Sequence, residues 1–332
     1  MNGMNLPLVF ITQMKIDEKL RAVYYEMLGD VAELIFADKI DPISRKTTID
    51  QARVLIVSNI RIDLLDEERS ALANVGFIQA LTAGIDHIPF STLPDGVPVA
   101  YNPGIYAEPM AEHILAMAFA AGKRLPQEHA ELRDGNFNQF VPNRQMAGSN
   151  CAILGLGGVG RATARMFRPL GISIHAINRS GETDEEVDSI STLDNLKQVL
   201  KDANIVVVGL SLTRKTMGLI GARELNWMKS DAILINVSRG EIIDQTSLYE
   251  HLVANQKFSA CIDAWWIEPV RHGEFSINHP FLDLPNVIAS PHNSAQISGI
   301  QKLPARAAAR NVQRFLLGEV PLHLVGDDER LR

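Results

Sequence analysis

The chain has 332 residues, of which 46% are hydrophobic and 21% are charged, a balance that is ordinary for a soluble globular protein. Because this length exceeds what a single hydrophobic core usually fills, we expect two domains. The net charge of −7 gives no electrostatic reason to expect nucleic acid or an anionic membrane as a partner.

Several features bear on where the protein works. Residues 1–15 lack a basic stretch and hold only a short apolar run, which predicts that there is no signal peptide. No stretch approaches the ~18 consecutive apolar residues of a membrane-spanning helix. The two cysteines, Cys151 and Cys261, lie in apolar strand-like runs, and we interpret them as buried free thiols of a reducing compartment. We therefore expect a cytoplasmic protein.

The N-terminal part of the chain alternates short β-rich runs with helical patterns, which is typical of βαβ units and parallel sheets. Helices are predicted over 16–28 and 63–73. This part carries no glycine-rich nucleotide loop. Strands are predicted over 6–12, 32–38, 52–58, 76–81 and 97–101.

Residues 109–124, PMAEHILAMAFAAGKR, predict one long helix with Pro109 near its first turn. Because the body of this helix is apolar on most faces, we expect it to be buried between domains or subunits. Glu112 and His113 fall inside it, and we interpret them as structural or helix-packing residues. The polar, irregular residues 126–148 then predict an arm or a linker.

A second α/β series begins near residue 149. Its strands are near-continuous apolar runs, which suit a parallel sheet that is covered on both faces. Helices are predicted over 158–170, 192–201, 244–255 and 294–317. Strands are predicted over 149–155, 172–178, 204–210, 232–237, 258–264 and 286–290.

The first strand of this series runs into GLGGVG, residues 155–160, and a helix follows. Such a loop lets the backbone turn tightly and approach a pyrophosphate, and the helix N-terminus adds free N–H groups and a positive dipole. A simple tight turn between strand and helix is the alternative interpretation. We favour a nucleotide site, whose cofactor-binding candidates are Gly155, Gly157, Gly158, Val159 and Gly160.

The end of the next strand bears on the choice of cofactor. An acidic side chain normally binds the ribose 2′-hydroxyl of NAD there, but this chain has Asn178, Arg179 and Ser180. The guanidinium of Arg179 suits a phosphate and Ser180 adds a hydroxyl, which favours NADP(H), with NAD(H) as the second choice. In the alternative interpretation Arg179 points to solvent, and Glu182 or Asp184 binds the ribose.

Further polar residues stand at strand ends, where ligands bind in open α/β sheets. Arg239 follows one strand, Asp263 and Glu268 follow the next, and His292 follows the last. An arginine can hold the carboxylate of an organic acid and polarise the neighbouring carbonyl. A histidine can move the hydroxyl proton while a carboxylate fixes its tautomer. Together these residues predict hydride transfer at a nicotinamide, and no metal is expected.

The motifs taken together resemble the D-isomer-specific 2-hydroxyacid dehydrogenases. LTAGIDH at 81–87 is similar to the substrate loop of this family, and YNPGIYAEPMAEH at 101–113 is similar to the entry into its interdomain helix. GLGGVG, INVSRG, the D-x-x-x-x-E-P pattern and SPHNSA follow in the order of the family. The resemblance covers nearly the whole chain.

The resemblance implies a role for each matching residue. Arg239 would bind the substrate carboxylate and keto oxygen, and His292 would be the general acid and base with Glu268 as its partner. The backbone amides of Ala83 and Gly84 would hold the substrate carboxylate. The cofactor pocket would include Asp263 near the carboxamide, Asn236, Val237 and Ser238 at the nicotinamide, and Leu210 and Thr213 near the adenine.

Two stretches depart from the family pattern. Residues 209–213 stand where the family has H-x-P-L-T, so the contacts of Leu210 and Thr213 rest on a partial match. The usual D-V-F is replaced by D-A-W and followed by a second tryptophan. Trp265 and Trp266 could narrow the substrate pocket, or they could lie in an interface.

The resemblance also implies the architecture. We expect an α/β fold with two doubly wound parallel-sheet domains, in which a Rossmann cofactor domain (104–294) is inserted into a flavodoxin-like substrate domain. The substrate domain would comprise residues 1–103 and a C-terminal helix within 295–332. A homodimer formed around the cofactor domain is implied as well.

These observations predict an NADPH-preferring reductase that converts a small 2-keto acid, such as glyoxylate or hydroxypyruvate, to the D-2-hydroxy acid. One alternative is a formate or phosphite dehydrogenase of the same fold, whose chemistry needs no proton transfer to a carbonyl. The other is a non-enzymatic, corepressor-like protein that senses NAD(H), because such a scaffold can keep the arginine, glutamate and histidine.

Overall fold

The computed structural model describes residues 6–326 and residue 330. The chain divides into two compact units: unit 1 is Met1–Ile105 with Ser298–Arg332, and unit 2 is Tyr106–Ile297. The domain boundaries predicted from the sequence, after residues 103 and 294, fall a few residues before these divisions. Residues 1–5, part of the stretch predicted to lack a signal peptide, lie outside the described residues.

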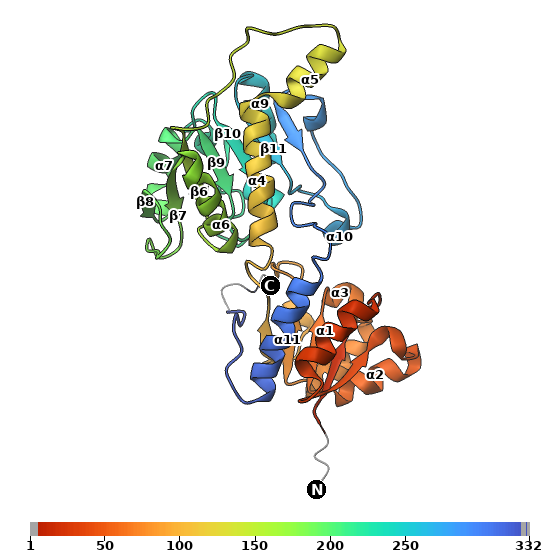
Figure 1. Ribbon diagram of the computed structural model, residues 1–332. Coiled ribbons are helices and arrows are strands. Elements are labelled where there is room, and N and C mark those ends of the chain that lie inside the picture. The colour runs from red at the N-terminus through yellow and green to blue at the C-terminus, as the bar shows by residue number, and fades with distance from the viewer. Residues whose placement is uncertain (1–5, 327–329, 331–332) are drawn as a thin grey trace. The chain divides into compact units, whose positions relative to one another are not determined.

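Unit 1 is built on a five-stranded parallel sheet (Figure 1). The strand order is β2-β1-β3-β4-β5, which is the order of flavodoxin-like folds. The strands are β1 (Leu8–Ile11), β2 (Glu33–Phe36), β3 (Val54–Val57), β4 (Phe77–Ala80) and β5 (Val99–Ala100). The α-helices are α1 (Glu18–Leu28), α2 (Pro42–Gln51), α3 (Ile60–Asp63) and α11 (Lys302–Leu316).

Both faces of this sheet are buried. Successive strand residues point to opposite faces, and they belong to two different buried clusters. Phe10 and Leu55 belong to one apolar cluster, whereas Val9 and Ile56 belong to another. Helix α11 contributes to the second cluster and lies beside α1 (Figure 1). The last helix of the chain therefore completes a core that the first strand begins.

Unit 2 contains a seven-stranded, fully parallel sheet of order β12-β11-β10-β9-β6-β7-β8. The order reverses between β6 and β9, as it does in Rossmann folds. The predicted fold class is therefore confirmed. The strands are β6 (Asn150–Leu154), β7 (Ser173–Ile177), β8 (Ser189–Ser191), β9 (Ile205–Val208), β10 (Ile233–Asn236), β11 (Ser259–Ile262) and β12 (Val287–Ala289). The α-helices are α4 (Ala107–Gly122), α5 (Leu125–Arg133), α6 (Gly158–Phe167), α7 (Leu196–Asp202), α8 (Ala222–Leu225), α9 (Gln245–Ala254) and α10 (Pro269–His272).

The two cysteines lie in strands β6 and β11 of this sheet. Both are free and fully buried, as the sequence predicted. Burial raises the pKa of the Cys261 thiol to about 12 and raises that of Cys151 as well, so both stay protonated and unreactive. No helix in the described part of the chain combines the length and the apolarity that crossing a membrane requires. The cytoplasmic location inferred from the sequence stays a prediction.

Helix α4 is the long apolar helix that the sequence predicted. Its buried side packs against α6 and against strands β10 and β11 of its own unit, and Figure 1 shows it running beside α6. A Cβ atom on Gly122 would lie 2.5 Å from Sδ of Met146, so the contact at the end of the helix is close. The buried side of α4 therefore belongs to the core of unit 2, and burial between domains or subunits is not needed to explain it.

Besides helices of a single turn, two helices were missed because their apolar pattern is weak. Helix α2 begins with strong local signals, since Asp41 caps Ile43 and Ser44 and is followed by Pro42. Helix α5 lies within the segment that was predicted to be an irregular arm.

Two other predictions differ in extent or type. The predicted helix at 63–73 is mainly a 3₁₀ helix, Asp66–Asn74. The last helix begins at Lys302 rather than near residue 294, because Gly299 has a positive φ of 75° that a helix does not allow.

Candidate active site

The glycine loop joins β6 to α6, and its three motif glycines differ in what surrounds them. Gly155 has a φ of 102°, and its N–H and that of Leu156 both donate to the Ile177 carbonyl. A Cβ atom on Gly160 would lie 2.3 Å from the carbonyl oxygen of Gly155. A Cβ atom on Gly157 would meet no atom within 4 Å.

These surroundings fit a dinucleotide. The first glycine makes the turn, the third allows close packing of helix and strand, and the second faces open space that a side chain would fill. Gly157 and Gly158 are exposed, and α6 begins at Gly158 with its free N–H groups. Val159, in contrast, turns its side chain toward the core of unit 2. The loop thus offers backbone, rather than side chains, to a pyrophosphate.

The loop after β7 is shaped by its own side chains. Oδ1 of Asn178 accepts the Gly181 N–H at 2.7 Å, and its Nδ2 donates to the Glu182 carbonyl at 2.7 Å. The Ser180 hydroxyl donates to the same carbonyl at 3.3 Å. The side chains of Arg179 and Ser180 are exposed. Asn178 therefore holds the turn, and Arg179 and Ser180 are presented outward.

The acidic residues beyond this loop are bound by arginines of α6. Nη1 of Arg161 lies 2.5 Å from Oδ1 of Asp184, and Nη2 of Arg165 lies 2.7 Å from Oε2 of Glu185. The hydrogen bond from Arg161 and its charge lower the pKa of Asp184. Because Arg161 already compensates this carboxylate, the contact argues against the alternative in which Asp184 binds the ribose.

Leu210 and Thr213 follow β9, the strand that pairs with β6. The Leu210 carbonyl accepts the hydroxyl of Ser238, which ties the loop after β9 to the loop after β10. The Thr213 N–H donates to Oγ1 of Thr216 at 2.8 Å, and the Thr216 hydroxyl donates to the Ser211 carbonyl at 2.7 Å. These bonds shape the turn, and the adenine contacts of Leu210 and Thr213 stay predictions.

Arg239 follows β10 on a loop that Asn236 organises. Nδ2 of Asn236 donates to the Arg239 carbonyl at 2.9 Å, and its Oδ1 accepts the Ser238 N–H at 3.1 Å. Nη1 of Arg239 donates to the Ser238 carbonyl at 2.8 Å. Val237 is buried, whereas Ser238 and Arg239 are half-buried. Asn236 is thus a support of the loop, and Arg239 is the charged side chain that it presents.

His292 and Glu268 form a close pair. Nδ1 of His292 lies 2.8 Å from each carboxylate oxygen of Glu268. Because a carboxylate only accepts, Nδ1 carries the hydrogen and Nε2 is left for a reacting group. The His292 side chain is 34% exposed, whereas that of Glu268 is 8% exposed. Oε1 of Glu268 also accepts the Trp265 N–H at 2.7 Å.

The electrostatics of this pair bring in Arg239. Burial raises the pKa of Glu268, and the hydrogen bond and charge of His292 are the first of the contributions that oppose it. The Trp265 N–H and the charge of Arg239 add to the lowering, so the pKa of Glu268 lies below its usual value. Glu268 is therefore the ionised partner at neutral pH. The predicted catalytic residues thus share one edge of the unit 2 sheet.

Asp263 organises the loop that carries His292. Its side chain is fully buried, and Oδ1 accepts the Ser290 hydroxyl at 2.5 Å and the Asn293 N–H at 3.0 Å. Oδ2 accepts the Ser294 N–H at 3.2 Å. The backbone N–H of His292 donates to the Asp263 carbonyl at 2.9 Å. The sequence pattern did not reveal this inward role, and a contact of Asp263 with the carboxamide stays a prediction.

The two tryptophans link the loops of the site. Nε1 of Trp265 donates to the Ser290 carbonyl at 2.9 Å, and Nε1 of Trp266 donates to the Ile243 carbonyl at 2.7 Å. A Cβ atom on Gly240 would lie 2.4 Å from the carbonyl carbon of Trp265. The residue after Arg239 must therefore be small. Trp265 is buried and Trp266 is half-buried, so their observed role is to join loops within unit 2.

Ala83 and Gly84 lie in unit 1, after the carboxyl end of β4. Both are half-buried, and the Gly84 carbonyl accepts the Thr82 hydroxyl at 2.8 Å. Asn102 supports the base of this loop, because its Nδ2 donates to the Leu81 carbonyl and its N–H donates to the Thr82 carbonyl. Their binding of a substrate carboxylate stays a prediction.

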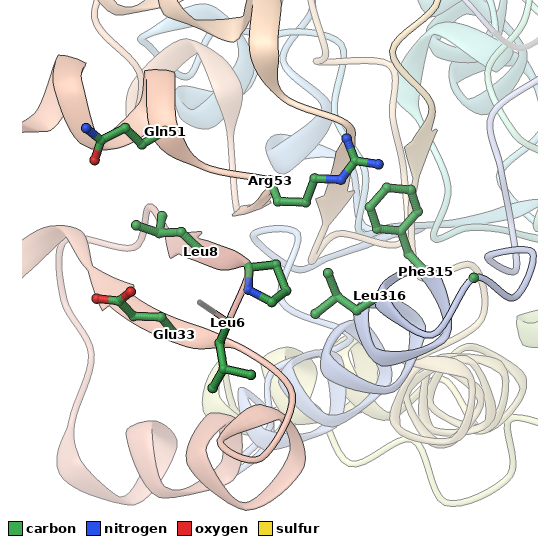
Figure 2. A pocket seen from close by; sticks show the side chains of 9 residues that line it. Leu6, Leu8, Glu33, Gln51, Arg53, Phe315 and Leu316 are labelled. Carbon is green, nitrogen blue, oxygen red and sulfur yellow. The ribbon is translucent and has the colours of Figure 1, made fainter. Parts of the chain in front are cut away.

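A cavity of about 710 Å³ in unit 1 is not the candidate active site. It is lined by residues at the amino ends of the strands, whereas ligands of such sheets bind at the carboxyl ends. Figure 2 shows Arg53 beside the ring of Phe315, and the guanidinium carbon lies 5.2 Å from the ring centre. Glu33 and Gln51 line the same cavity.

A Rossmann unit whose sheet edge carries an arginine and a glutamate–histidine pair defines a class, the nicotinamide-dependent oxidoreductases. The family model "D-isomer specific 2-hydroxyacid dehydrogenase, NAD binding domain" matches residues 115–294, which is more than half of the chain. The chain therefore belongs to the D-isomer specific 2-hydroxyacid dehydrogenase family, and it is an NAD(P)-dependent 2-hydroxyacid dehydrogenase.

Similar proteins agree with this assignment. The glyoxylate reductase/hydroxypyruvate reductase of Mus musculus is 30% identical over 291 residues, which cover 84% of this chain and 86% of that protein. The glyoxylate reductase of Aeropyrum pernix is 28% identical over 337 residues, which cover 97% and 96%. A solved D-isomer specific 2-hydroxyacid dehydrogenase of Xanthobacter autotrophicus Py2, in complex with NADPH and MES, is 25% identical with a TM-score of 0.79, over 97% of this chain and 98% of that chain. The resemblance inferred from the motifs is confirmed.

Proposed function

We propose that this dehydrogenase is an NADPH-preferring reductase of a small 2-keto acid. Glyoxylate and hydroxypyruvate are the first candidate substrates, and a chiral product would be the D-2-hydroxy acid. The observation that carries the proposal is the pair of His292 and Glu268 at the carboxyl edge of the Rossmann sheet, with the charge of Arg239 acting on the same carboxylate. The names of the relatives, glyoxylate reductase among them, support the substrate class.

In this proposal each residue has one task. Arg239 binds the substrate carboxylate and polarises the carbonyl that is to be reduced. His292 donates a proton from Nε2 to the carbonyl oxygen and keeps its Nδ1 hydrogen on Glu268. The bound nicotinamide supplies the hydride that reaches the carbonyl carbon. Amides of Ala83 and Gly84 help to hold the carboxylate.

Single substitutions test these tasks. Arg239→Ala and His292→Ala should each lower kcat/KM for glyoxylate by roughly 10²–10⁴-fold, the usual worth of a positioned acid or of an ion-paired donor. Arg310→Ala, an exposed arginine of α11, serves as the control and should behave like the parent. Folded variants that reduce a panel of 2-keto acids as fast as the parent would overturn the proposal.

The preference for NADPH is proposed from the loop after β7. Arg179 and Ser180 are exposed there, and Arg161 compensates Asp184, so Asp184 adds little repulsion toward a 2′-phosphate that Arg179 attracts. Arg179→Ala should raise the KM for NADPH much more than the KM for NADH. Equal effects on the two cofactors would show that Arg179 does not contact the 2′-phosphate, and Glu182 would then be the residue to test for ribose binding.

The two alternatives give different results in the same assays. A formate or phosphite dehydrogenase transfers no proton to a carbonyl and would reduce no keto acid, although phosphite oxidation still releases a proton from the attacking water. A corepressor-like NAD(H)-binding protein would bind cofactor without turning over any keto acid. A matrix of about a dozen 2-keto acids against NADH and NADPH distinguishes the proposed reductase from both alternatives, and it also names the preferred substrate.

A homodimer is part of the proposal. Helix α5 and the segment after it expose large apolar side chains, and Phe137 and Phe140 are 77% and 91% exposed. Such a patch on an extended segment is typical of a subunit interface. Changing both residues to serine should shift sedimentation from dimer to monomer, whereas Ile43→Ser, an equally exposed site on α2, should not. A monomeric parent would contradict the proposal.

A further inference from the structure

His113, on helix α4, is in contact with the loop that carries His292. Nε2 of His113 lies 3.0 Å from Oγ of Ser290, and Oγ of Ser290 lies 2.5 Å from Oδ1 of Asp263. Nε2 of His113 and Oδ1 of Asp263 are 3.9 Å apart. The side chain of His113 is 26% exposed, whereas that of Asp263 is fully buried. All of these residues belong to unit 2.

Counting hydrogens fixes the direction of these bonds. The carboxylate of Asp263 accepts the amide hydrogens of Asn293 and Ser294, so it acts as an acceptor toward the hydroxyl as well. The single hydrogen of the Ser290 hydroxyl therefore goes to Asp263. The remaining lone pairs of Oγ can only accept, so Nε2 of His113 must carry a hydrogen and donate it.

The anchored loop holds an uncommon backbone conformation. His292 has a φ of 51°, in the left-handed region that a residue with a Cβ rarely adopts. Such a conformation persists only where neighbouring bonds hold it. Here the bonds from Ser290, Asn293 and Ser294 to Asp263 lie on both sides of His292, and the His292 N–H is held by the Asp263 carbonyl.

We propose that His113 is a positioning residue for this reaction, an inference that rests on the proposed role of His292. Its Nε2–H fixes the Ser290 hydroxyl on Asp263, and this anchor keeps the backbone of His292 left-handed. The His292 ring is thereby held against Glu268, with Nε2 toward the substrate. His113 touches neither substrate nor cofactor in this role, and it acts through Ser290 and Asp263.

The surroundings of His113 favour this role over helix packing alone. The buried side of α4 is apolar, and its neighbours include Ala111, Ile114 and Met117. An apolar side chain would pack there without desolvating a polar ring. A half-buried imidazole gains only when its N–H meets an acceptor, and Ser290 supplies one.

Kinetics with matched variants test the proposal. His113→Leu removes the donor, and kcat should fall about three- to tenfold because the His292 ring is held less firmly, while the KM for the cofactor changes little. His113→Gln keeps an N–H at similar reach and should restore kcat to within about twofold of the parent. Glu112→Gln, an exposed neighbour on the same helix, should match the parent.

Ser290→Ala gives a second, independent readout. Its loss of kcat should be at least as large as that of His113→Leu, and the double variant should lose no more than Ser290→Ala alone, because both changes break one chain of bonds. Losses that multiply in the double variant would overturn the proposal. So would a His113→Leu enzyme with unchanged kcat, or one whose loss follows its thermal unfolding and is not restored in His113→Gln.

A spectroscopic measurement does not depend on any variant folding. Nitrogen-15 chemical shifts of labelled parent protein should show His113 protonated at Nε2, and a ring protonated only at Nδ1 would overturn the proposal. The failure of this inference can be told apart from failure of the proposed function. If His292→Ala is inactive while the His113 tests fail, only the positioning role is wrong; if His292→Ala stays active, the proposed function itself is wrong.

Discussion

The ionised state of Glu268 ties stability to pH. Its pKa is lowered in the folded protein, so its contribution to the free energy of unfolding is present above the ordinary glutamate pKa, about 4.3, and is lost as the pH falls through the lower folded-state value. We expect the difference in thermal midpoint between the parent and Glu268→Gln to be largest near pH 7 and to shrink below about pH 4. Differential scanning calorimetry across this range measures it, and a pH-independent difference would contradict the assignment.

Gly157 and Gly160 of the glycine loop allow the effects on folding and on cofactor binding to be separated. Gly160→Ala places a Cβ atom 2.3 Å from a carbonyl oxygen, which should cost about 1–3 kcal/mol of unfolding free energy. Gly157→Ala meets no protein atom within 4 Å and should leave stability nearly unchanged. It should instead raise the KM for the cofactor, because the methyl group fills the space of the pyrophosphate. Urea unfolding with parallel cofactor titration measures both, and similar effects of the two changes would contradict this division.

At the level of elements, unit 1 depends on a buried polar contact between a strand and its last helix. Nδ2 of Asn311 on α11 donates to Oε1 of Gln79 on β4 at 2.6 Å and to the Leu322 carbonyl at 3.0 Å. Both side chains are buried, so Asn311→Leu leaves Oε1 of Gln79 without this donor. The change should lower the free energy of unfolding by about 1–3 kcal/mol.

The positions of the tryptophans allow the unfolding of unit 1 and of unit 2 to be followed separately. All three, Trp227, Trp265 and Trp266, lie in unit 2. In Asn311→Leu the unfolding transition followed by circular dichroism should acquire an earlier phase, whereas tryptophan fluorescence should keep the transition of the parent. A fluorescence transition that moves by the same amount would mean that the two units unfold together.

At the scale of the whole molecule, unit 2 is one continuous segment with its own core on both faces of its sheet. Residues 106–297 expressed alone should fold cooperatively and bind NADPH, because the glycine loop and the loop after β7 are both present. The fragment should reduce no keto acid, since it lacks Ala83 and Gly84, which are proposed to hold the substrate carboxylate. Calorimetric titration with NADPH tests this, and an unfolded fragment would contradict it.

The sequence predicted the sheets well because their strands are short apolar runs, and it predicted the strand-end residues because parallel strands share one edge. Arg239, Glu268 and His292 were predicted as catalytic residues in this way, and each follows the carboxyl end of a strand of unit 2. The inward role of Asp263 could not be found, because a pattern does not tell which way a side chain after a strand turns. Ser290, two residues before His292, could have indicated this role, because a serine hydroxyl can donate a hydrogen bond to a buried carboxylate.

The contact of His113 with Ser290 joins residues 177 apart in the chain. Sequence spacing does not predict contacts between residues so far apart. The apolar pattern of the helix instead favoured a packing role for His113. Arg161 was missed for a similar reason, since only the folded loop brings Asp184 to the first turn of α6. Helix α2, in contrast, was predictable from its cap residue Asp41 and from Pro42. It was missed because its hydrophobic periodicity is weak.

The core of unit 1 has a consequence for the order of events during synthesis. Strands β1 to β5 are made first, but Ala305, Ala308 and Val312 of α11 cover one face of their sheet. At roughly 5–20 residues per second, about two hundred further residues take on the order of 10–40 s to emerge from a ribosome. For that interval Val9, Ile11 and Ile56 lack the part of their native cover that α11 supplies, while unit 2 is completed before the helix that closes unit 1.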